Sequence, residues 1–370
     1  MTPSPNQVRR HLQEFGLKFG LSPQNIDKRL ERLMGPQRFQ DYVAVLEHSR
    51  AAGRPISDVY GLFETLEEAN LVMSHQSELM MQIAHWLLSQ LERVARPGLT
   101  IVDLGSWTGI LTRLLAVTLP DCRVIGIDRV APVVALASAT GGPPNLQFLN
   151  WDYSRLDGKP HIRADVLVSS LGIDFGSRIG VHSLDVSALR QSPVYDASLA
   201  EFTPYLAGWP AIAADGASLH AILRISDIEP MLAFTDAAHK NGWSVLLADS
   251  TKIVETSQSK IPALNLLACG LTELLAEDEV LSWYGWTDCQ SVDYKGAQAM
   301  AIYRSLVGRT VSDRRSKTFD DGHIMSVEVG RAGTTGYLFA RATTGYAELR
   351  LAGLLEINKL APSFGWEQLG

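Results

Sequence analysis

Three aspartates that follow short apolar runs are the residues whose type and spacing could do chemistry in this chain. Asp103, Asp128 and Asp152 stand at or near the ends of three successive runs. Runs of this kind are typical of buried parallel strands, whose carboxyl ends meet at one edge of a sheet, where ligands bind. Carboxylates gathered there would attract a cation and accept hydrogen bonds from hydroxyl and amino groups.

A glycine loop follows the first of these acids, in the sequence VDLGSWTG (102–109). Gly105 and Gly109 allow positive φ and a close approach of the backbone to a ligand. NAD(P) binding is an alternative, because it also uses glycines after the first strand and an acid after the second. The complete G-x-G-x-x-G is absent, however, and no G-K-[ST] phosphate loop occurs. The loop and the third acid therefore favour a ligand without phosphate.

The elements that would position these residues are strands that alternate with helices. Apolar runs predict strands over residues 99–105, 123–128, 146–152, 164–170, 216–225, 243–249 and 261–268. Segments with helical spacing lie between them, and such alternation is typical of a parallel sheet with right-handed crossovers. We predict an α/β fold with a doubly wound, mostly parallel seven-stranded sheet.

Three regions are expected along the 370 residues. Residues 1–96 have apolar residues at three- and four-residue spacing, which predicts an N-terminal helical region that can cover a substrate. Residues 97–268 hold the predicted sheet, and residues 269–370 form a C-terminal α+β extension. Within the extension we expect a helix over 271–283, a solvated loop over 309–317 and antiparallel strands in 323–351.

The glycine loop resembles the first motif of the class I S-adenosylmethionine (SAM)-dependent methyltransferases, which commonly reads D/E-x-G-x-G-x-G. Asp103, Gly105 and Gly109 match it, and Trp107 stands at the middle glycine. Some small-molecule methyltransferases of this class are similar in carrying a bulky residue there. The resemblance covers roughly residues 99–250, and it implies SAM as cofactor and a Rossmann-like fold for the sheet domain.

The resemblance also implies a role for each acid. Asp103 would hold the ammonium of SAM, Asp128 both ribose hydroxyls, and Asp152 the adenine amino group, with Trp151 or Arg129 against the adenine face. These roles suit a ligand with an ammonium, a sulfonium and a diol. The cofactor-binding residues expected are Asp103, Gly105, Ser106, Trp107, Gly109, Asp128, Arg129, Trp151, Asp152 and Ser170.

The segment after the fourth strand, residues 169–189, should face the transferable methyl group. It lacks the Asn/Asp-Pro-Pro-aromatic tetrad of many nucleic-acid and protein amine methyltransferases, and residues 169–185 hold none of the glutamates of protein-arginine methyltransferases. A small-molecule acceptor is therefore expected. Asp174 could position or deprotonate it, and His182 could be the base, with Asp185 orienting His182.

Further residues could line the acceptor side. Tyr60, His75 and Gln76 are expected near the entrance to the sheet. The aromatic residues Trp283, Tyr284 and Trp286 could line an apolar pocket, although core packing is the more common role of such residues.

Other functions are compatible with the same predicted fold. SAM could donate its aminocarboxypropyl group or cyclise on itself, and the chain could instead be a non-catalytic interaction partner. The by-product would separate these chemistries, because methyl transfer releases S-adenosylhomocysteine and the alternatives release methylthioadenosine.

The composition of the chain disfavours several classes of binding partner. The net charge of −7 disfavours nucleic acid. No apolar run approaches the roughly 18–20 residues that cross a bilayer, and the N-terminus lacks the apolar core of a signal peptide, so a cytoplasmic location without membrane contact is expected. The three cysteines show no metal-ligand spacing, and no metal is expected. We expect a biosynthetic enzyme, and a homodimer is compatible with the sequence.

Overall fold

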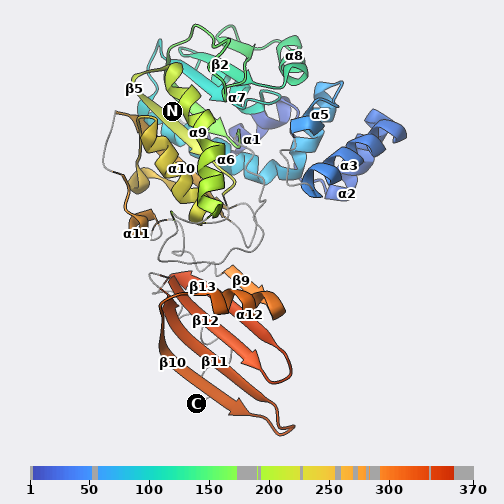
Figure 1. The fold of residues 1–370 in the computed structure, drawn as a ribbon. Helices are drawn as coiled ribbons and strands as arrows, with labels where there is room; N and C mark the ends of the chain where they lie inside the picture. Colours follow the sequence, from blue (N-terminus) through green and yellow to red (C-terminus); the bar gives the residue numbers. More distant parts are fainter. Residues whose placement is uncertain are drawn as a thin grey trace. The chain divides into compact units, whose positions relative to one another are not determined.

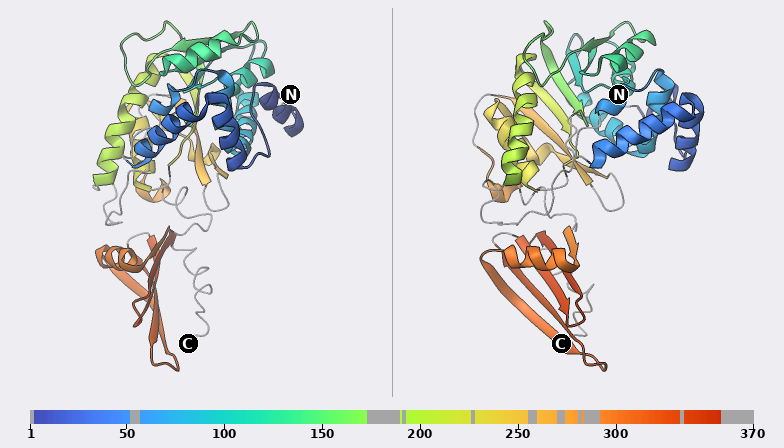
Figure 2. Two further views of the ribbon diagram at one scale, coloured as in Figure 1. Left: turned by 90° about the vertical axis from the view of Figure 1, so that its right-hand side faces the viewer. Right: turned by 45° about the vertical axis from the view of Figure 1, so that its right-hand side comes forward.

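The computed structural model describes residues 3–51, 57–172, 190, 193–225, 228–254, 260–269, 274–280, 283, 292–332 and 335–353. Figures 1 and 2 show its ribbon. The chain divides into two compact units. The first consists of Met1–Arg178, Thr203–Ser226 and Ala238–Thr272, and the second of Ile179–Phe202, Asp227–Ala237 and Glu273–Gly370.

An eight-stranded sheet is the centre of the first unit. Its strands are β1 (Thr100–Leu104), β2 (Arg123–Asp128), β3 (Leu146–Asn150), β4 (Ala164–Ser170), β5 (Ala213–Ile222), β6 (Trp243–Val245), β7 (Thr251–Val254) and β8 (Lys260–Ala268). Seven of them follow the order β3-β2-β1-β4-β5-β8-β6, and β7 pairs with β8 off this path. The first five strands pair in parallel, and β8 is antiparallel to both neighbours. The predicted doubly wound, mostly parallel sheet is confirmed.

The strand order places the carboxyl ends of β1, β2 and β4 together. The chain runs outward from β1 to β3 and then returns to β4 on the other side of β1. This reversal is the topological switch point at which open α/β sheets bind ligands. In the register, Asp103 lies beside Gly126 and Val168, and Asp128 lies beside Asn150. The two acids therefore end neighbouring strands at the same edge.

The N-terminal region is helical, as predicted. Its helices are α1 (Pro5–Glu14), α2 (Pro23–Met34), α3 (Pro36–Ala51), α4 (Ser57–Tyr60), α5 (Leu66–Met73), the 3-10 turn η1 (Ser74–Gln76) and α6 (Ser77–Val94). Ser4 and Ser22 cap the first two helices, each before a proline whose fixed φ suits the first turn. Thr65 and Glu68 form a capping box that starts α5. Each of these helices therefore begins at a capping residue that is specified by the local sequence alone.

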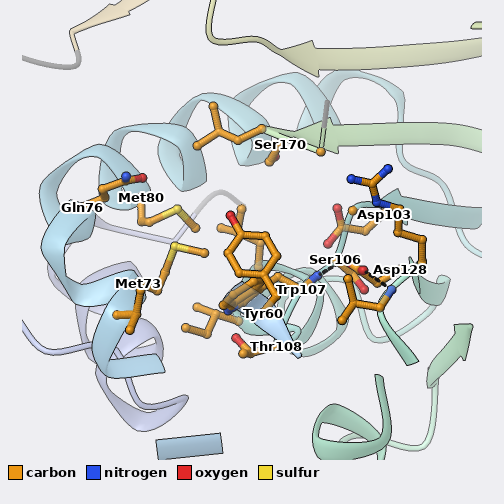
Figure 3. Close-up of a pocket in the computed structure, with 18 of the residues that line it drawn as sticks. Tyr60, Met73, Gln76, Met80, Asp103, Ser106, Trp107, Thr108, Asp128 and Ser170 are labelled. Carbon is orange, nitrogen blue, oxygen red and sulfur yellow. Dashed lines mark hydrogen bonds between the residues drawn. The ribbon is translucent and has the colours of Figure 1, made fainter. Parts of the chain in front are cut away.

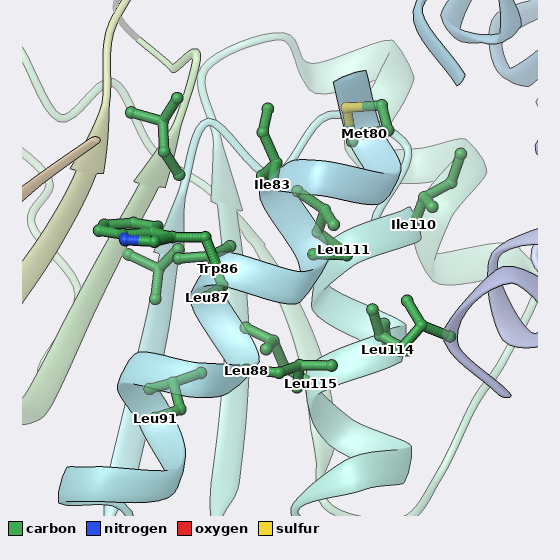
Figure 4. Close-up of a cluster of buried hydrophobic side chains, with 14 of the residues drawn as sticks. Met80, Ile83, Trp86, Leu87, Leu88, Leu91, Ile110, Leu111, Leu114 and Leu115 are labelled. Atoms are coloured by element: carbon green, nitrogen blue, oxygen red, sulfur yellow. The ribbon is translucent and has the colours of Figure 1, made fainter. Parts of the chain in front are cut away.

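Two apolar clusters join this helical region to the sheet. In the first, α6 and α7 (Ile110–Thr118) both contribute side chains to one cluster, in which Leu87 and Leu114 are fully buried (Figure 4). In the second, Trp107 of the glycine loop and Val133 pack with residues of α2 and α5, including Ile26. The N-terminal helices are thus built onto the same loop that borders the predicted cofactor site.

The later part of the first sheet departs from the prediction at β6 and at β7, which was not predicted. Helix α8 (Ala131–Ala139) links β2 to β3, while α9 (Pro193–Gly208) and α10 (Ile228–Lys240) contribute residues to both units. The strand predicted over 243–249 is shorter, because the chain turns into the 3-10 helix η4 (Leu247–Asp249) after β6. The apolar run WSVLLAD continues past the strand since Leu247 is buried in that turn.

The second unit contains a five-stranded antiparallel sheet. Its elements are α11 (Glu277–Val280), β9 (Val292–Lys295), α12 (Gly296–Ser305), β10 (Arg309–Thr318), β11 (Ile324–Ala332), β12 (Thr335–Ala342) and β13 (Ala347–Gly353), with the strand order β10-β11-β12-β13-β9. The predicted strands within 323–351 are confirmed. The expected loop over 309–317 is wrong, because β10 pairs with β11 along its length as an exposed, charged edge strand. Of the helix expected over 271–283, the described residues show only α11.

A buried carboxylate ties α12 to this second sheet. Glu328 of β11 is 5% exposed and accepts hydrogen bonds from the hydroxyls of Tyr303 and Tyr337, each at 2.6 Å, and it also pairs with Arg314. The ring of Tyr303 stacks on Phe339 with centroids 3.8 Å apart. Because each acceptor oxygen of Glu328 is satisfied, we interpret this cluster as structural.

The described residues contain neither a candidate membrane span nor a group of metal-ligating side chains. None of their helices combines the length and the apolar character that a membrane span needs. Nor do their His, Cys, Asp and Glu side chains gather in threes as a metal site would require.

Candidate functional site

A cavity opens at the switch point of the first sheet, within the first unit (Figure 3). It holds about 1130 Å³ of empty space, its open mouth included. The lining residues are Tyr60, Val72, Met73, Gln76, Met80, Asp103, Gly105, Ser106, Trp107, Thr108, Ile110, Leu111, Asp128, Arg129, Val130, Tyr153, Ser170, Leu171, Gly172 and Arg224.

Asp103 presents an unpaired carboxylate oxygen to this cavity. Its side chain is 2% exposed, and its Oδ2 accepts a hydrogen bond from the Thr112 hydroxyl at 2.6 Å. Its Oδ1 is buried and has no partner. Burial raises the pKa of Asp103 to about 6, and the nearby charge of Asp128 acts in the same direction. A cationic ligand group at Oδ1 would relieve both costs.

Asp128 supports the glycine loop from the next strand. Its Oδ2 accepts the backbone N–H of Trp107 and its Oδ1 that of Val130, both at 2.9 Å. Burial raises the pKa of Asp128, and these two N–H donors oppose that rise. A carboxylate has about four lone-pair sites, so both oxygens can still accept hydrogen bonds from a ligand.

The glycine loop is held in a conformation that few residues adopt. Gly105 has φ of +78°, and a Cβ atom there would lie 2.5 Å from the Cα of Gly172. Trp107 and Leu171 are the two non-glycine residues with positive φ in the described part of the chain, and both line the cavity. Backbone strain of this kind gathers at ligand sites, where the surrounding packing maintains it.

The N-terminal helices form the opposite, largely apolar wall. Met73 ends α5, Met80 lies in α6, and Gln76 lies between them in η1; Figure 3 shows them across the cavity from Asp103 and Asp128. The ring of Tyr60 lies edge-on to Trp107, with centroids 3.8 Å apart. The cavity therefore has an acidic end at the strand tips and an apolar end at the helices.

A cation also borders the cavity, just past the end of β5. Arg224 donates a hydrogen bond from Nη2 to the Oε1 atom of Gln76 at 2.5 Å. Its guanidinium therefore lies at the helical wall, on the Gln76 side.

Comparison with known proteins gives partial matches, and no family model matches the chain. A release factor glutamine methyltransferase of Salmonella typhimurium is 33% identical over 104 residues, which are 26% of this chain and 35% of that protein. One of Burkholderia pseudomallei is 30% identical over 142 residues, which are 34% of this chain and 47% of that protein. The chain thus spans less than half the length of these curated relatives.

Among solved structures, magnesium protoporphyrin IX methyltransferase from Synechocystis PCC 6803 with bound SAM is 17% identical, with a TM-score of 0.33. The match covers 55% of this chain and 84% of that one. The fold assignment rests on the strand order, with an antiparallel strand inserted between β5 and β6. The first unit therefore has a Rossmann-like α/β fold. In this fold the cavity occupies the switch point between β1 and β4.

Most of the expected cofactor-binding residues line the cavity. Those that do are Asp103, Gly105, Ser106, Trp107, Asp128, Arg129 and Ser170. Gly109, the last residue of the loop, does not line the cavity; it is the N-cap of α7, where a Cβ would lie 2.3 Å from the Phe148 ring. The contacts of these residues with SAM stay a prediction.

Trp151 and Asp152 lie outside the cavity lining. The indole Nε1 of Trp151 donates to the carbonyl of Asp157 at 3.2 Å, and Asp152 accepts from the backbone and hydroxyl of Ser154. The next residue, Tyr153, lines the cavity and donates its hydroxyl to the carbonyl of Gly172 at 2.7 Å. Strand β3 ends at Asn150, two residues before Asp152, which leaves Asp152 in a turn.

The residues predicted for catalysis cannot be placed. Asp174, His182 and Asp185 lie outside the described residues, as do Tyr284 and Trp286. His75 does not line the cavity, and its Nε2 lies 3.3 Å from Asp27 Oδ1. Trp283 belongs to the second unit. Tyr60 and Gln76, expected at the entrance, do line the cavity.

Sequence reasoning missed several lining residues. Met73 and Met80 have helical spacing that also fits core packing, so no signal marked them. Arg224 did carry a signal, because it is the next-to-last residue of the fifth predicted strand, as Asp103 and Asp128 lie at or near the ends of the first two. Applying the strand-tip rule to all charged residues, and not to acids alone, would have found it.

Replacing Asp103 with asparagine is expected to stabilise the unliganded protein at pH 7.5. The pKa of about 6 in the folded protein lies above the ordinary aspartate value of 3.8, so the carboxyl group of Asp103 costs stability increasingly as pH rises from about 4 to 6. The expected gain is about 1–2 kcal/mol, because the new amide leaves a buried N–H group without a partner. Urea unfolding at several pH values measures it, and a wild-type-to-variant difference that does not change with pH would contradict the prediction.

Proposed function

We propose that this chain binds SAM in the cavity and transfers its methyl group to a small-molecule acceptor, as a biosynthetic enzyme. The observation that carries the proposal is the pair of buried carboxylates, Asp103 and Asp128, on neighbouring strand tips beside a glycine loop. Asp103 keeps one buried oxygen unpaired. A buried acid in that state is costly without a cation, and SAM carries an ammonium and a sulfonium.

The polar atoms around the cavity fit the rest of SAM. Buried atoms without a hydrogen-bond partner include Ser106 Oγ, Thr108 Oγ1, Trp107 Nε1 and Ser170 Oγ. Such groups are normally satisfied, so their concentration at one cavity supports a polar ligand. Helix α7 starts directly after Gly109, and its N-terminus suits a carboxylate. Asp128 would accept the ribose hydroxyls with its remaining lone pairs.

The protein's contribution to the reaction would be mainly alignment. SAM supplies a methyl group on a sulfonium, and the acceptor's lone pair forms the new bond while the carbon–sulfur bond breaks and its electron pair stays on sulfur. The strand-tip acids would hold the donor, and the helical wall would hold the acceptor in line with it. A proton lost by the acceptor passes to solvent or to a base, for which Asp174 and His182 remain the proposed residues.

The form of the cavity favours a small acceptor. Met73 and Met80 line the cavity across from the acids and Tyr60 also lines it, so these largely apolar side chains suit the hydrocarbon part of a small molecule. The net charge of −7 weakens any interaction with nucleic acid. We therefore propose a small molecule over a nucleic acid or a membrane-bound substrate.

A protein acceptor is the second candidate, favoured by the two curated relatives. Both are named release factor glutamine methyltransferases. The segment after β4 in this chain reads SSLGID and lacks the Asn/Asp-Pro-Pro-aromatic tetrad that grips a planar nitrogen. That difference places the small-molecule acceptor first.

The function is tested by binding and by product analysis. Calorimetric titration of the full chain with SAM is expected to show saturable binding, and NADH is expected to show none. Incubation with SAM and candidate acceptors, followed by mass spectrometry, should yield S-adenosylhomocysteine and an acceptor heavier by one methylene. Methylthioadenosine as the by-product would indicate another SAM reaction, and a protein that binds no SAM would disprove the proposal.

A further inference from the structure

A buried arginine on helix α7 is hydrogen-bonded to the glycine loop. Arg113 is 5% exposed, and it donates from Nη1 to the Thr108 carbonyl at 2.7 Å and from Nη2 to the Ala137 carbonyl at 2.6 Å. Thr108 lines the cavity, whereas Arg113 does not. Resting on the proposed function, we propose that Arg113 is a positioning residue, which fixes the second half of the glycine loop so that the Thr108 hydroxyl binds the donor.

The two halves of the glycine loop are held by different groups. The backbone N–H groups of residues 105–107 donate to the Ile127 carbonyl and to Asp128 Oδ2, with distances of 2.8 to 3.0 Å. Both acceptors belong to the end of β2. The Thr108 carbonyl, in the second half, accepts from the Arg113 side chain instead. The orientation of this half therefore depends on a side chain of α7.

The peptide group between Thr108 and Gly109 is the part of the loop that needs such a bond. Gly109 has φ of +78°, and glycine adopts positive and negative φ about equally readily, so this peptide group could rotate if it were released. Its carbonyl is bonded to Arg113, and its N–H donates to the Ser106 carbonyl at 2.8 Å. The guanidinium thus fixes the peptide plane, and with it the direction of the Thr108 side chain.

The Thr108 hydroxyl connects this peptide group to the ligand. Thr108 is fully buried among the residues that line the cavity (Figure 3), and its Oγ1 has no hydrogen-bond partner. Buried hydroxyls are normally hydrogen-bonded, so an unpaired one at a cavity indicates a contact with a polar ligand. Helix α7 begins two residues later, and its N-terminus suits the carboxylate of the donor.

The surroundings of Arg113 hold its guanidinium in one orientation. The Ala137 carbonyl lies in the last turn of α8, where the helix dipole is negative, and the guanidinium carbon lies 5.0 Å from the centroid of the Phe148 ring. Burial lowers the pKa of Arg113, and no carboxylate in the described part of the chain pairs with it. Two carbonyl oxygens and a ring face therefore orient this planar group.

Arg113 could instead act only as a structural link between α7 and α8, through the Ala137 carbonyl. Such a link would affect stability, but it would not act on the ligand through Thr108. Two residues that act through one another show non-additive effects, whereas independent residues show additive ones. Coupling between Arg113 and Thr108 in ligand binding is therefore the measurement that separates the two roles.

The test is a double-mutant cycle on the full chain, with S-adenosylhomocysteine titrated by calorimetry. Thr108→Val removes the hydroxyl, and we expect about tenfold weaker binding. Arg113→Lys keeps the charge but loses the fork geometry, and we expect a three- to tenfold loss. The double variant should bind no more than about twofold more weakly than the weaker single variant. Multiplied losses, of about thirtyfold or more, would overturn the inference.

Asn145→Ala is the matched control for a buried polar link of the same helix. Its Nδ2 donates to the carbonyls of Ala116, Leu119 and Cys122, at the other end of α7. This variant should unfold at a lower temperature but bind S-adenosylhomocysteine within about twofold of wild type. An equal loss of affinity in Asn145→Ala and Arg113→Lys would show a structural role and overturn the inference.

A second substitution, Arg113→Gln, removes the charge and should weaken binding more than Arg113→Lys, with the same coupling to Thr108→Val. It also serves if the lysine variant does not fold. Affinity that is unchanged in the Arg113 variants, or in Thr108→Val, contradicts the inference. Wild type that binds neither SAM nor S-adenosylhomocysteine would instead disprove the proposed function.

Discussion

Replacing Asp128 with alanine is expected to weaken SAM binding by about 1.5–3 kcal/mol, or roughly ten- to a hundredfold in Kd. Two effects add. The variant loses the charge-assisted hydrogen bonds that Asp128 would accept from the ribose hydroxyls. It also leaves the backbone N–H groups of Trp107 and Val130 without their acceptor, which loosens the glycine loop. Calorimetric titration with SAM measures the change.

Asp152→Ala is the matched control, since Asp152 also follows a strand at the same edge. Its carboxylate bonds only locally, to Ser154, and does not line the cavity. We expect its SAM affinity to remain near that of wild type. Asp128→Asn keeps one acceptor oxygen and should fall between Asp128→Ala and wild type. Equal losses in the alanine variants of Asp128 and Asp152 would show that the adenosyl group is placed wrongly.

The parts of the site that lie on strand tips could be predicted from sequence. Each buried strand appears as a short apolar run, and Asp103 and Asp128 end two adjacent runs. The rule that parallel strands present their carboxyl ends at one edge then brings the two acids together. This inference needs only local patterns and the topology of the sheet.

The third acid shows where that rule fails. Asp152 was expected at the tip of its strand, but β3 ends at Asn150, so the next residues turn. Tyr153 reaches the cavity instead. Strand ends from sequence are uncertain by a few residues, and a shift of one residue changes which side chain faces the ligand.

Contacts between segments that are distant along the chain could not be predicted from the sequence either. The packing of Tyr60 on Trp107 joins residues from separate regions, and the helical spacing around Tyr60 does not specify its partner. Trp107 adopts a left-handed backbone conformation that a tryptophan rarely takes, so its residue type gave no indication of it. Such conformations are maintained by tertiary packing.

Gly105→Ala is expected to lower the free energy of unfolding by about 2–5 kcal/mol and to abolish measurable SAM binding. A left-handed conformation costs a non-glycine residue about 1–2 kcal/mol. The added Cβ would also lie 2.5 Å from the Cα of Gly172, a backbone atom that cannot rotate away. Overpacking of this kind costs about 1–3 kcal/mol more. Denaturant unfolding and SAM titration measure the two effects.

The variant Gly98→Ala measures the cost of the left-handed backbone conformation without the cost of the steric clash. Gly98 has φ of +85°, close to that of Gly105, but a Cβ there would meet nothing within 4 Å. This variant should therefore lose only about 1–2 kcal/mol and retain its SAM affinity. If Gly105→Ala were no less stable than Gly98→Ala, the close approach of the loop to the chain after β4 would be wrong. That approach is what forms the floor of the cavity between β1 and β4, so the binding site would then have to be redrawn.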